Sequence, residues 1–561
     1  MQESRNLILA ITLSIFVILS WEYYNLKHRP VPNVVETTSL SNTNDTIIKK
    51  NSTQKAPQKQ KIKSISIPFE TDKLSGVLST QGLGFNNVTL KNYETEKDSG
   101  TNVQLLKNDG SNEKYFLNLN WFVDGRSLYS NNDVWKIHSG KELTSTTPIT
   151  FKFYNNKDQI TIYRTISIDD NYLFTVTDKI TNHSNQNITL NQYGLINKGM
   201  EELNQSLLIL HEGAFGVFNG TLNEVKYKKL LKKGQINHSS NAGWMGISDK
   251  YWFTAIIPNP EKFYHYRFTG YNKNDIKKFQ SDFKSDDIII ESGQDYNSKT
   301  LVFIGAKEIE LIDEYANNHD ILLFDRTIDF GLLYFITKPI YLLLKTLYQY
   351  FHNFGLAIIA LTILIRILLF PLASKSFREI SKIRNIHPEI SKVKESCGSD
   401  KMRMNREIMA LYKEHKIKPM MGCLPVIIQV FIFFALYKVL FVTIDMRHAE
   451  FYGWIKDLTA PDPTSILNLF GLLPYETTIP FGIWPCLLGL TMILQQKLNP
   501  TPNDPMQAKV MKFLPYLFTI LFAGFPSGLV LYWTFNNTFS IGQQYVIMKQ
   551  TEKALKKKKR K

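Results

Sequence analysis

The residue with the least expected surroundings in this 561-residue chain is Arg366. It lies twelve residues into an apolar stretch, Gly355 to Leu372, that is nearly long enough to cross a membrane. A charge at such a depth costs on the order of 2.5 to 3.5 kcal/mol on insertion scales. The guanidinium is permanently positive and presents several donors, so the chemistry open to it is electrostatic attraction of anionic or polar groups.

Two interpretations of Arg366 are open. Its side chain could reach the headgroups, because about six residues of helix, ~9 Å, separate it from the cytoplasmic end of the stretch. Alternatively it lines a water-filled cavity within a helix bundle, where Thr362 shares its face one turn earlier. An intramembrane salt bridge is not available, since the predicted spans contain no acid except Glu22 at the outer edge of the first.

Polar side chains recur on other apolar stretches. Trp533, Asn537, Ser540 and Gln544 follow one another at i, i+4, i+7 and i+11, and Gln429 lies well inside a further stretch. Polar groups in hydrocarbon face each other or water, so this pattern predicts an amphiphilic groove that includes Arg366. Hydrogen bonding between helices is the alternative explanation for the amides.

The positioning elements are six predicted membrane spans. A mean hydropathy of −0.18 averages a polar first half with an apolar C-terminal third, which excludes a purely soluble enzyme. Of the net charge of +16, 13 charges fall in residues 373–419 and in the tail 549–561. The positive-inside rule places both segments, and the two chain ends, in the cytoplasm. The spans are about Leu7 to Trp21, Gly355 to Leu372, Met420 to Val442, Pro480 to Leu494, Phe513 to Phe525 and Ser527 to Val546, the fourth and fifth being short.

The first half of the chain has the residue pattern of β-strands. Runs such as Thr161 to Ile168 alternate polar and apolar residues and are separated by Asn-rich turns, which predicts a large antiparallel β-sandwich on the outer side of the membrane. Its histidines have no metal-ligand spacing, and we find no catalytic constellation or metal site there. All three cysteines lie after residue 390, so the sandwich holds no internal disulfide.

Two helical segments flank the second span. Before it, Lys338, Tyr341, Lys345 and Gln349 form a polar edge on an aromatic helix, which favours an amphipathic helix at the membrane interface over a further span. After it, apolar residues step by three and four on both sides of a turn at residues 397–400, which predicts a helical hairpin with a coiled-coil seam. Its basic outer face is either solvated or meets anionic lipid, ribosomal RNA or an acidic partner. The seam residues that we select as functional candidates are Ile383, Ile390, Met404 and Ile408.

Three motifs carry a family resemblance. The stretch Lys418 to Pro425 with Gln429, the run Asp504 to Gln507 and the hairpin Phe525 to Trp533 resemble the YidC membrane protein insertase family in its six-span Gram-negative form. The likeness extends over essentially the whole chain and includes the single arginine of the second span. The family often has Tyr-Tyr where this chain has Tyr532-Trp533.

The resemblance implies an insertase and chaperone of the bacterial inner membrane, with a periplasmic domain similar to a sugar-mutarotase β-supersandwich and a five-helix insertase core. It implies no enzyme activity, cofactor or small-molecule substrate. The implied partners are nascent integral membrane proteins, membrane lipids and the Sec translocon, and we hypothesise that the basic tail approaches the ribosome. The groove residues would be Arg366, Thr362, Gln429, Trp533, Asn537 and Ser540.

Two other functions compete with the insertase. A secondary transporter would need intramembrane acids or histidines for ion coupling, and a membrane-tethered carbohydrate-processing protein would need clustered carboxylates in the β domain.

The predicted organisation is an anchor (1–24), a flexible linker (25–63), the periplasmic β domain (64–310), a helical connector with the interfacial helix (311–353), the core (354–548) containing the hairpin (375–418), and the basic tail (549–561).

Overall fold

The structure is a computed structural model that describes residues 64–107, 113–203, 211–398, 400–418, 421, 424–466, 481–499 and 505–559. The predicted anchor and linker, residues 1–63, lie outside the described residues, as do Cys423 and Asp504 of the family motifs.

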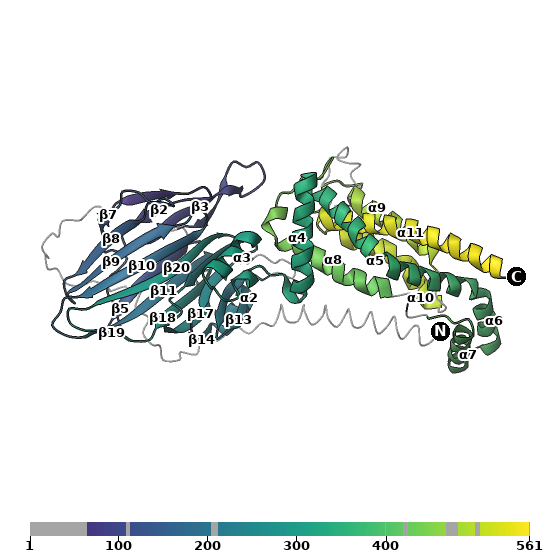
Figure 1. Cartoon of the computed structure of the whole chain (residues 1–561), viewed down its shortest axis with the longest axis horizontal. Helices are drawn as coiled ribbons and strands as arrows, with labels where there is room; N and C mark the ends of the chain where they lie inside the picture. The colour runs from purple at the N-terminus through teal and green to yellow at the C-terminus, as the bar shows by residue number, and fades with distance from the viewer. Residues whose placement is uncertain are drawn as a thin grey trace. The chain divides into compact units, whose positions relative to one another are not determined.

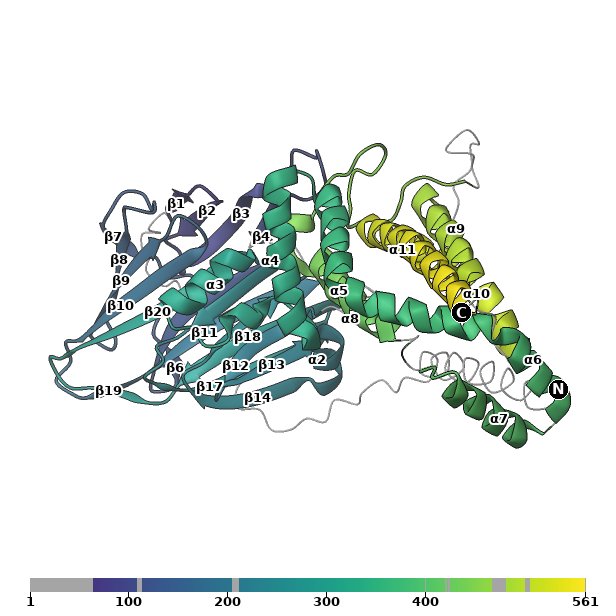
Figure 2. The same ribbon diagram turned by 45° about the vertical axis from the view of Figure 1, so that its right-hand side comes forward.

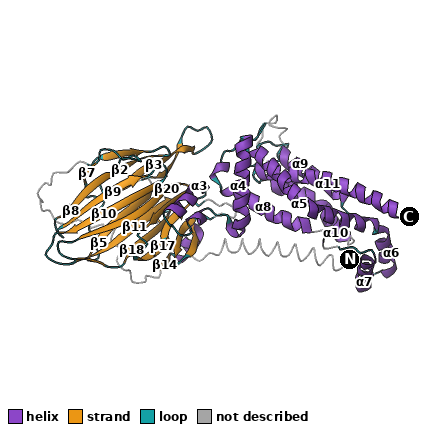
Figure 3. Cartoon of the chain, viewed as in Figure 1, coloured by secondary structure: helices purple, strands orange, loops and turns teal. Residues whose placement is uncertain are grey.

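Twenty β-strands lie between residues 66 and 306 of the described chain, and most of the described chain after residue 306 is helical (Figures 1 and 3). The strands are β1 (Ser66–Glu70), β2 (Leu74–Ser79), β3 (Gly84–Glu94), β4 (Asn102–Leu106), β5 (Tyr115–Val123), β6 (Arg126–Ser127), β7 (Lys136–Ser139), β8 (Ile149–Asn155), β9 (Ile160–Ile168), β10 (Leu173–Asn182), β11 (Ile188–Met200), β12 (Gly213–Phe218), β13 (Thr221–Lys226), β14 (Gln235–Asn241), β15 (Trp244–Ser248), β16 (Trp252–Ile257), β17 (Phe263–Lys273), β18 (Ile276–Ser285), β19 (Ile288–Ile290) and β20 (Asp295–Ala306).

The strands form three sheets, and the pairings between these strands are antiparallel. Their orders are β1-β2-β3-β4, β13-β12-β15-β16-β20-β10-β9-β8-β7 and β14-β17-β18-β11-β5-β6, with β19 pairing with β11. The alternation seen in the sequence becomes alternating burial: every second side chain of β5 is buried, starting at Tyr115. The prediction of an antiparallel β domain is confirmed.

A buried ion pair joins the two larger sheets. Arg164 of β9 and Asp178 of β10 are register partners, and their side chains are only 2% and 4% exposed. The guanidinium donates to both carboxylate oxygens at 2.7 Å and to the carbonyl of Leu119, on β5 of the other sheet, at 3.0 Å. Trp121, also of β5, donates its indole N–H to the same carboxylate at 2.7 Å. The charges are therefore neutralised and hydrogen-bonded across the interface between sheets.

We expect Asp178→Asn to lower the free energy of unfolding of the β domain by about 3 to 5 kcal/mol, because it leaves a buried guanidinium without a counter-charge. The matched control is Asp295→Asn, which breaks the exposed pair with Lys179 and should lower the free energy of unfolding far less, because solvent screens this pair. Thermal unfolding of the full chain in detergent, followed by far-ultraviolet circular dichroism, measures both. Equal shifts for the two variants would contradict the role given to the buried pair.

The helical part of the chain begins at the end of β20. Its elements are α3 (Ile309–Asn318), η1 (Phe324–Thr327), η2 (Gly331–Leu333), α4 (Tyr334–Phe351), α5 (Phe354–Asn385), α6 (His387–Cys397), α7 (Lys401–Glu414), α8 (Leu424–Val442), η4 (Ile444–Met446), α9 (Ile483–Leu498), α10 (Pro505–Ala523) and α11 (Ser527–Lys559), while α2 (Tyr227–Lys233) belongs to the β domain. Of the described residues, α5 alone is long and apolar enough to cross a membrane by length and composition, and Ile427–Val442 forms a shorter apolar helix. The count of six spans remains a prediction.

Several helices extend beyond the apolar stretches from which they were predicted, among them α10 and α11. Helix α10 starts at Pro505, eight residues before the predicted start of the fifth span. Helix α11 continues to Lys559, so most of the basic tail is part of the same helix. The short length expected for the fifth span therefore does not describe the helix that contains it.

Three residues of the polar edge predicted for α4 contact other parts of the protein. Lys338 and Lys345 pair with Asp313 and Glu310 of α3, both at 2.8 Å. Tyr341 is buried and donates to Asp445 at 2.9 Å, whereas Gln349, the fourth residue of the edge, is exposed. Five large apolar side chains of α4 are exposed, namely Phe335, Leu342, Leu343, Tyr350 and Phe351. The location of α4 at the membrane interface stays a prediction. The polar residues hold α4 onto the connector and the loop after α8.

Candidate functional site

Helix α11 makes polar contacts with three other helices of the described chain. It packs along α5 and α9 and touches α8 (Figures 1 and 2). The residues that carry these contacts on α11 are Tyr532, Asn536, Asn537, Ser540 and Gln544. Four of them are spaced by four residues and so lie along one side of the helix.

Arg366 of α5 is hydrogen-bonded to Asn536 of α11. Its Nε and Nη2 atoms donate to the side-chain oxygen of Asn536 at 2.9 and 2.6 Å, and Nη2 also donates to the backbone carbonyl of Asn536 at 2.9 Å. Asn536 is buried, whereas Arg366 is only partly so. Within the described residues no carboxylate forms an ion pair with Arg366. Its acceptors are neutral, so the site keeps a full positive charge.

The surroundings of Arg366 on α5 are apolar and open. Ile367 and Leu368, the next two residues, are 65% and 78% exposed, and Ile363, Leu364 and Phe370 are exposed as well. The arginine thus turns toward α11 while its sequence neighbours present apolar surface to the outside of the helix bundle. This arrangement differs from the extension toward the end of the helix that was one of the two expectations.

The predicted groove residues occupy different places. Thr362 is buried and donates to the carbonyl of Ile358 at 2.7 Å, so its hydroxyl is bound within α5. Gln429 of α8 donates to the hydroxyl of Tyr532. Trp533 packs edge-on against Phe433, with the ring centroids 4.7 Å apart, and so belongs to an aromatic cluster.

The two remaining candidates join α11 to α9. Asn537 donates to the hydroxyl of Thr491 at 3.3 Å, and Ser540 accepts from Gln495 at 3.2 Å. A third contact continues the series, in which Gln544 donates to Asn499 at 2.9 Å. Residue numbers rise together on both helices, so α9 and α11 run parallel. We call these three hydrogen-bonded pairs the α9–α11 ladder.

The start of α9 is held by a buried carboxylate from the preceding loop. Asp462 accepts from the backbone N–H of Trp484, in the first turn of α9, at 3.0 Å. It also accepts from the N–H and the hydroxyl of Thr464, at 3.0 and 2.7 Å, and from the indole N–H of Trp454 at 3.1 Å. A negative charge at this end of a helix satisfies free donors and complements the helix dipole.

The hairpin residues form a closed interior. Ile390 and Ile408 are buried in one apolar cluster with Ile386 and Ile417, and Ile383 and Met404 pack against it. The four selected residues therefore come together, but they face inward. Their position allows them to hold the two arms of the hairpin and leaves any external contact to other residues.

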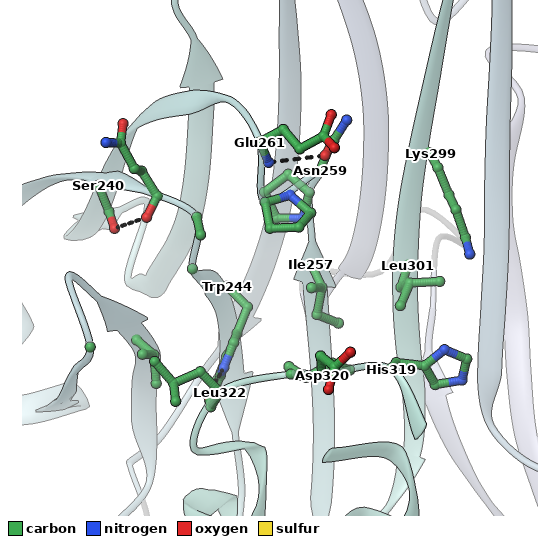
Figure 4. Close-up of a pocket in the computed structure, with 18 of the residues that line it drawn as sticks. Ser240, Trp244, Ile257, Asn259, Glu261, Lys299, Leu301, His319, Asp320 and Leu322 are labelled. Carbon is green, nitrogen blue, oxygen red and sulfur yellow. Dashed lines mark hydrogen bonds between the residues drawn. The ribbon is translucent and has the colours of Figure 1, made fainter. Parts of the chain in front are cut away.

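A pocket in the β domain has a volume of about 490 Å³. Ile257 of β16 and Leu301 of β20 lie near its centre, with Glu261 on one side and His319 and Asp320 on the other (Figure 4). The two acids are exposed to solvent. The pocket combines an apolar floor with a polar rim.

A buried lysine in the β domain is accounted for by its neighbours. Lys307 donates to the hydroxyl of Ser248 at 3.2 Å, and burial lowers its pKa to about 8 while the nearby Asp249 acts in the opposite direction. The Asp249 carboxylate in turn binds Lys198 and the hydroxyl of Tyr227. These contacts form a satisfied structural network. Within the described residues, no group of three or more His, Cys, Asp or Glu side chains could hold a metal ion.

Several residues of the site were not selected from the sequence. Asn536 is adjacent to Asn537, and only the latter fitted the stripe that began at Trp533. A spacing of four from Tyr532 would have found Asn536, Ser540 and Gln544 together. The partners of the ladder on α9 and at its C-terminal cap are Thr491, Gln495 and Asn499. They are also spaced by four, so pairing two such series was the signal that could have revealed them.

A double-mutant cycle tests the α9–α11 ladder. We expect Gln495→Leu to destabilise the helical domain, and Gln495→Leu combined with Ser540→Ala to show a coupling free energy of about 0.6 kcal/mol and at most about 1.7 kcal/mol, as for hydrogen bonds between membrane helices. Thermal unfolding in detergent gives the values. The control pairs Gln495→Leu with Thr443→Val, whose hydroxyl bonds within its own segment, and should be additive. Additivity in both cycles would refute the ladder.

Comparisons with known proteins identify the two parts of the chain. Residues 66–343 match the family model of the YidC periplasmic domain, and residues 346–555 match that of the 60Kd inner membrane protein. The chain is 40% identical to the membrane protein insertase YidC of Rickettsia bellii over 554 residues, covering 97% of this chain and 98% of the relative. It is also 40% identical to that of Rickettsia akari over 569 residues, covering 97% and 99%. A crystal structure of an active YidC insertase with its first transmembrane domain resolved covers 87% of this chain and 92% of its own, at 16% identity and a TM-score of 0.35.

The matches define an inner-membrane protein with a β-rich periplasmic domain followed by a helical insertase region. The chain belongs to the YidC family of membrane protein insertases. Its function is therefore the insertion of proteins into the membrane, and the transporter and carbohydrate-processing alternatives are set aside.

Proposed function

We propose that this insertase crosses the membrane six times and works through a groove beside Arg366. The five described helices α5, α8, α9, α10 and α11 contain all or most of the apolar stretches predicted as spans two to six. Exposed apolar side chains on α5, α8 and α10 support contact with lipid. The basic segments 373–419 and 549–561 support a cytoplasmic hairpin and C-terminus, and leave the β domain in the periplasm.

The observation that carries the mechanism is that Arg366 is bound to a neutral amide. A client membrane protein brings an apolar segment with a polar, often acidic, flank, and moving that flank through hydrocarbon is the main barrier to insertion. A guanidinium held by Asn536 is ordered yet not neutralised, so a carboxylate can displace the amide and gain a charge-assisted hydrogen bond. When the flank leaves, Asn536 takes its place as acceptor.

The groove that we propose has Arg366 as its charged residue, with Gln429, Asn537 and Ser540 supplying polar groups along α8 and α11. Thr362 and Trp533 support it from within the packed bundle. The apolar segment of the client leaves along α8 and α10, where Val430, Phe434, Tyr516 and Ile520 are exposed. Partitioning into lipid supplies the energy, and the membrane potential can add ~2.3 kcal/mol per charge per 100 mV.

The same proposal includes partners on the cytoplasmic side. The hairpin 375–418 captures nascent chains, and the end of α11 together with the last basic residues approaches the ribosome. Support comes from charge: residues 549–561 hold eight basic residues and the single acid Glu552. Cooperation with the Sec translocon belongs to this proposal too and rests on the resemblance to the family.

Insertion in reconstituted liposomes tests the charge of the groove. We expect Arg366→Ala to lower protease-protected insertion of a small single-span protein with an acidic flank by about tenfold or more, as for the loss of a charge-assisted hydrogen bond of about 1.5 to 3 kcal/mol. Arg366→Lys should retain most activity because the charge remains. Ile367→Ala is the matched control, since its side chain is exposed next to the arginine. Unchanged insertion by Arg366→Ala would remove the arginine from the mechanism.

The tail is tested separately by truncation. We expect deletion of residues 556–561, which removes six of the eight basic residues of the tail, to weaken co-sedimentation of the protein with ribosomes and to make the remainder less sensitive to salt. Replacing the six residues by Gln, which keeps the length, is the control for chain length. Co-sedimentation equal to that of the intact chain would argue against ribosome contact through the tail.

A further inference from the structure

The outer face of α7 has an unusual composition. Met402, Arg406, Met409 and Lys413 follow one another at i, i+4, i+7 and i+11 and therefore share one side of the helix. Met402 is 76% exposed and Met409 is 51% exposed. The opposite side of α7 carries Met404 and Ile408, which belong to the apolar interior of the hairpin. The helix thus has a second apolar component that the hairpin itself does not use.

The exposure of these methionines is selective. They are the two large apolar side chains that are exposed among the described residues of the hairpin, 375–398 and 400–418. The other exposed positions of α7, such as Asn405, are polar or small. Single exposed apolar residues are common on protein surfaces and indicate no particular function. Two exposed methionines spaced by seven residues instead match the spacing at which a second helix makes repeated contacts.

We propose that this Met402–Met409 face is the surface on which the hairpin receives the apolar segment of a client before insertion. The proposal deepens the proposed insertase function and rests on it. Methionine is unbranched, flexible and polarizable, so it adapts to apolar sequences of many shapes. This property suits a protein whose clients differ in sequence and share only an apolar segment.

The positive charges on the Met402–Met409 face indicate a second property of the client, in addition to its apolar segment. Arg406 lies between the two methionines and Lys413 lies beyond them, and within the described residues neither forms an ion pair. Arg403 is different, because it pairs with Glu407 at 2.9 Å on the side of the helix. The face therefore combines apolar contact with uncompensated positive charge, and it complements an apolar helix that has acidic residues at one end.

A membrane surface fits the same face less well. Helices that lie in the interface bury a continuous apolar side, usually with Leu, Phe or Trp, and gain affinity from its area. Here Arg406 separates two methionines, so the apolar area is small and interrupted. A small area gives weak, rapidly reversible binding, which a receiving surface needs in order to release its client to the groove.

Substitution of both methionines is the first part of the test. The full-length protein is reconstituted in liposomes and supplied with in vitro translated single-span client carrying an acidic flank. We expect Met402→Ser with Met409→Ser to raise the client concentration that gives half-maximal insertion several-fold and to leave the maximal rate unchanged. Met402→Leu with Met409→Leu is the matched control and should stay close to wild type, because it keeps the apolar character.

Crosslinking identifies what the face touches. A photoreactive amino acid at position 402 or 409 should crosslink to a ribosome-stalled client, and crosslinking should fall when the acidic flank of the client is replaced by amides. The same probe at Glu395, exposed on α6, should give little product. Crosslinks to phospholipid in the absence of client, in place of crosslinks to the client, would overturn the proposal in favour of a membrane contact.

The result that would overturn the inference alone is an unchanged half-maximal concentration for the serine variant while wild type inserts client normally. If wild type inserts no client at all, the proposed function fails and the inference fails with it. The two failures are distinguished by the wild-type measurement.

Discussion

The constraint on which the helical domain depends is that hydrocarbon offers no hydrogen-bond partners. A polar side chain on an apolar helix must therefore find its partner on another helix, in water or, as Thr362 does, on the backbone of its own helix. In this protein the partners converge on α11, which binds α8 through Tyr532, α5 through Asn536 and α9 through the ladder. These contacts lie at successive positions along the axis of α11. Their order therefore determines which helix is hydrogen-bonded to α11 at each position.

The two halves of the chain hold a buried arginine in contrasting ways. In the β domain, Arg164 has a carboxylate, a carbonyl and two aromatic rings around it, so its charge is neutralised and serves to join two sheets. In the helical domain, Arg366 has an amide and a carbonyl, which order the side chain without removing its charge. A neutralised arginine suits a structural role, and an ordered but unneutralised one is available to a ligand.

The sequence was informative wherever periodicity and composition act locally. Alternation predicted the antiparallel β domain, and steps of three and four predicted the hairpin whose interior contains Ile390 and Ile408. Single residues such as Arg366 could be recognised because the free energy needed to place a charged side chain in an apolar stretch depends on the residue type alone. The partners of those residues could not be assigned, since Asn536 and Asn537 are neighbours in sequence yet face α5 and α9 respectively. That choice is set by how the helices pack, and a single sequence does not encode it in any local pattern.

The polar edge of α4 is a second case in which a local pattern could be recognised but its contacts could not be assigned. A row of Lys338, Tyr341 and Lys345 on an aromatic helix has the composition of an interfacial element. The carboxylates that meet this row come from α3 and from the loop after α8, more than twenty residues away in either direction. Periodicity identified a special face correctly, but the identity of what covers it depended on residues distant in sequence.

Helix α5 runs without interruption from Phe354 to Asn385, so Arg366 and the hairpin residue Ile383 belong to the same rod. The two residues are separated by about 26 Å of helix at 1.5 Å per residue. Pro371 lies between them and removes one backbone hydrogen bond of the helix, so α5 can bend at this point. The helix that carries the unneutralised arginine thus also supplies part of the hairpin interior, and a bend at Pro371 sets the angle between these two parts.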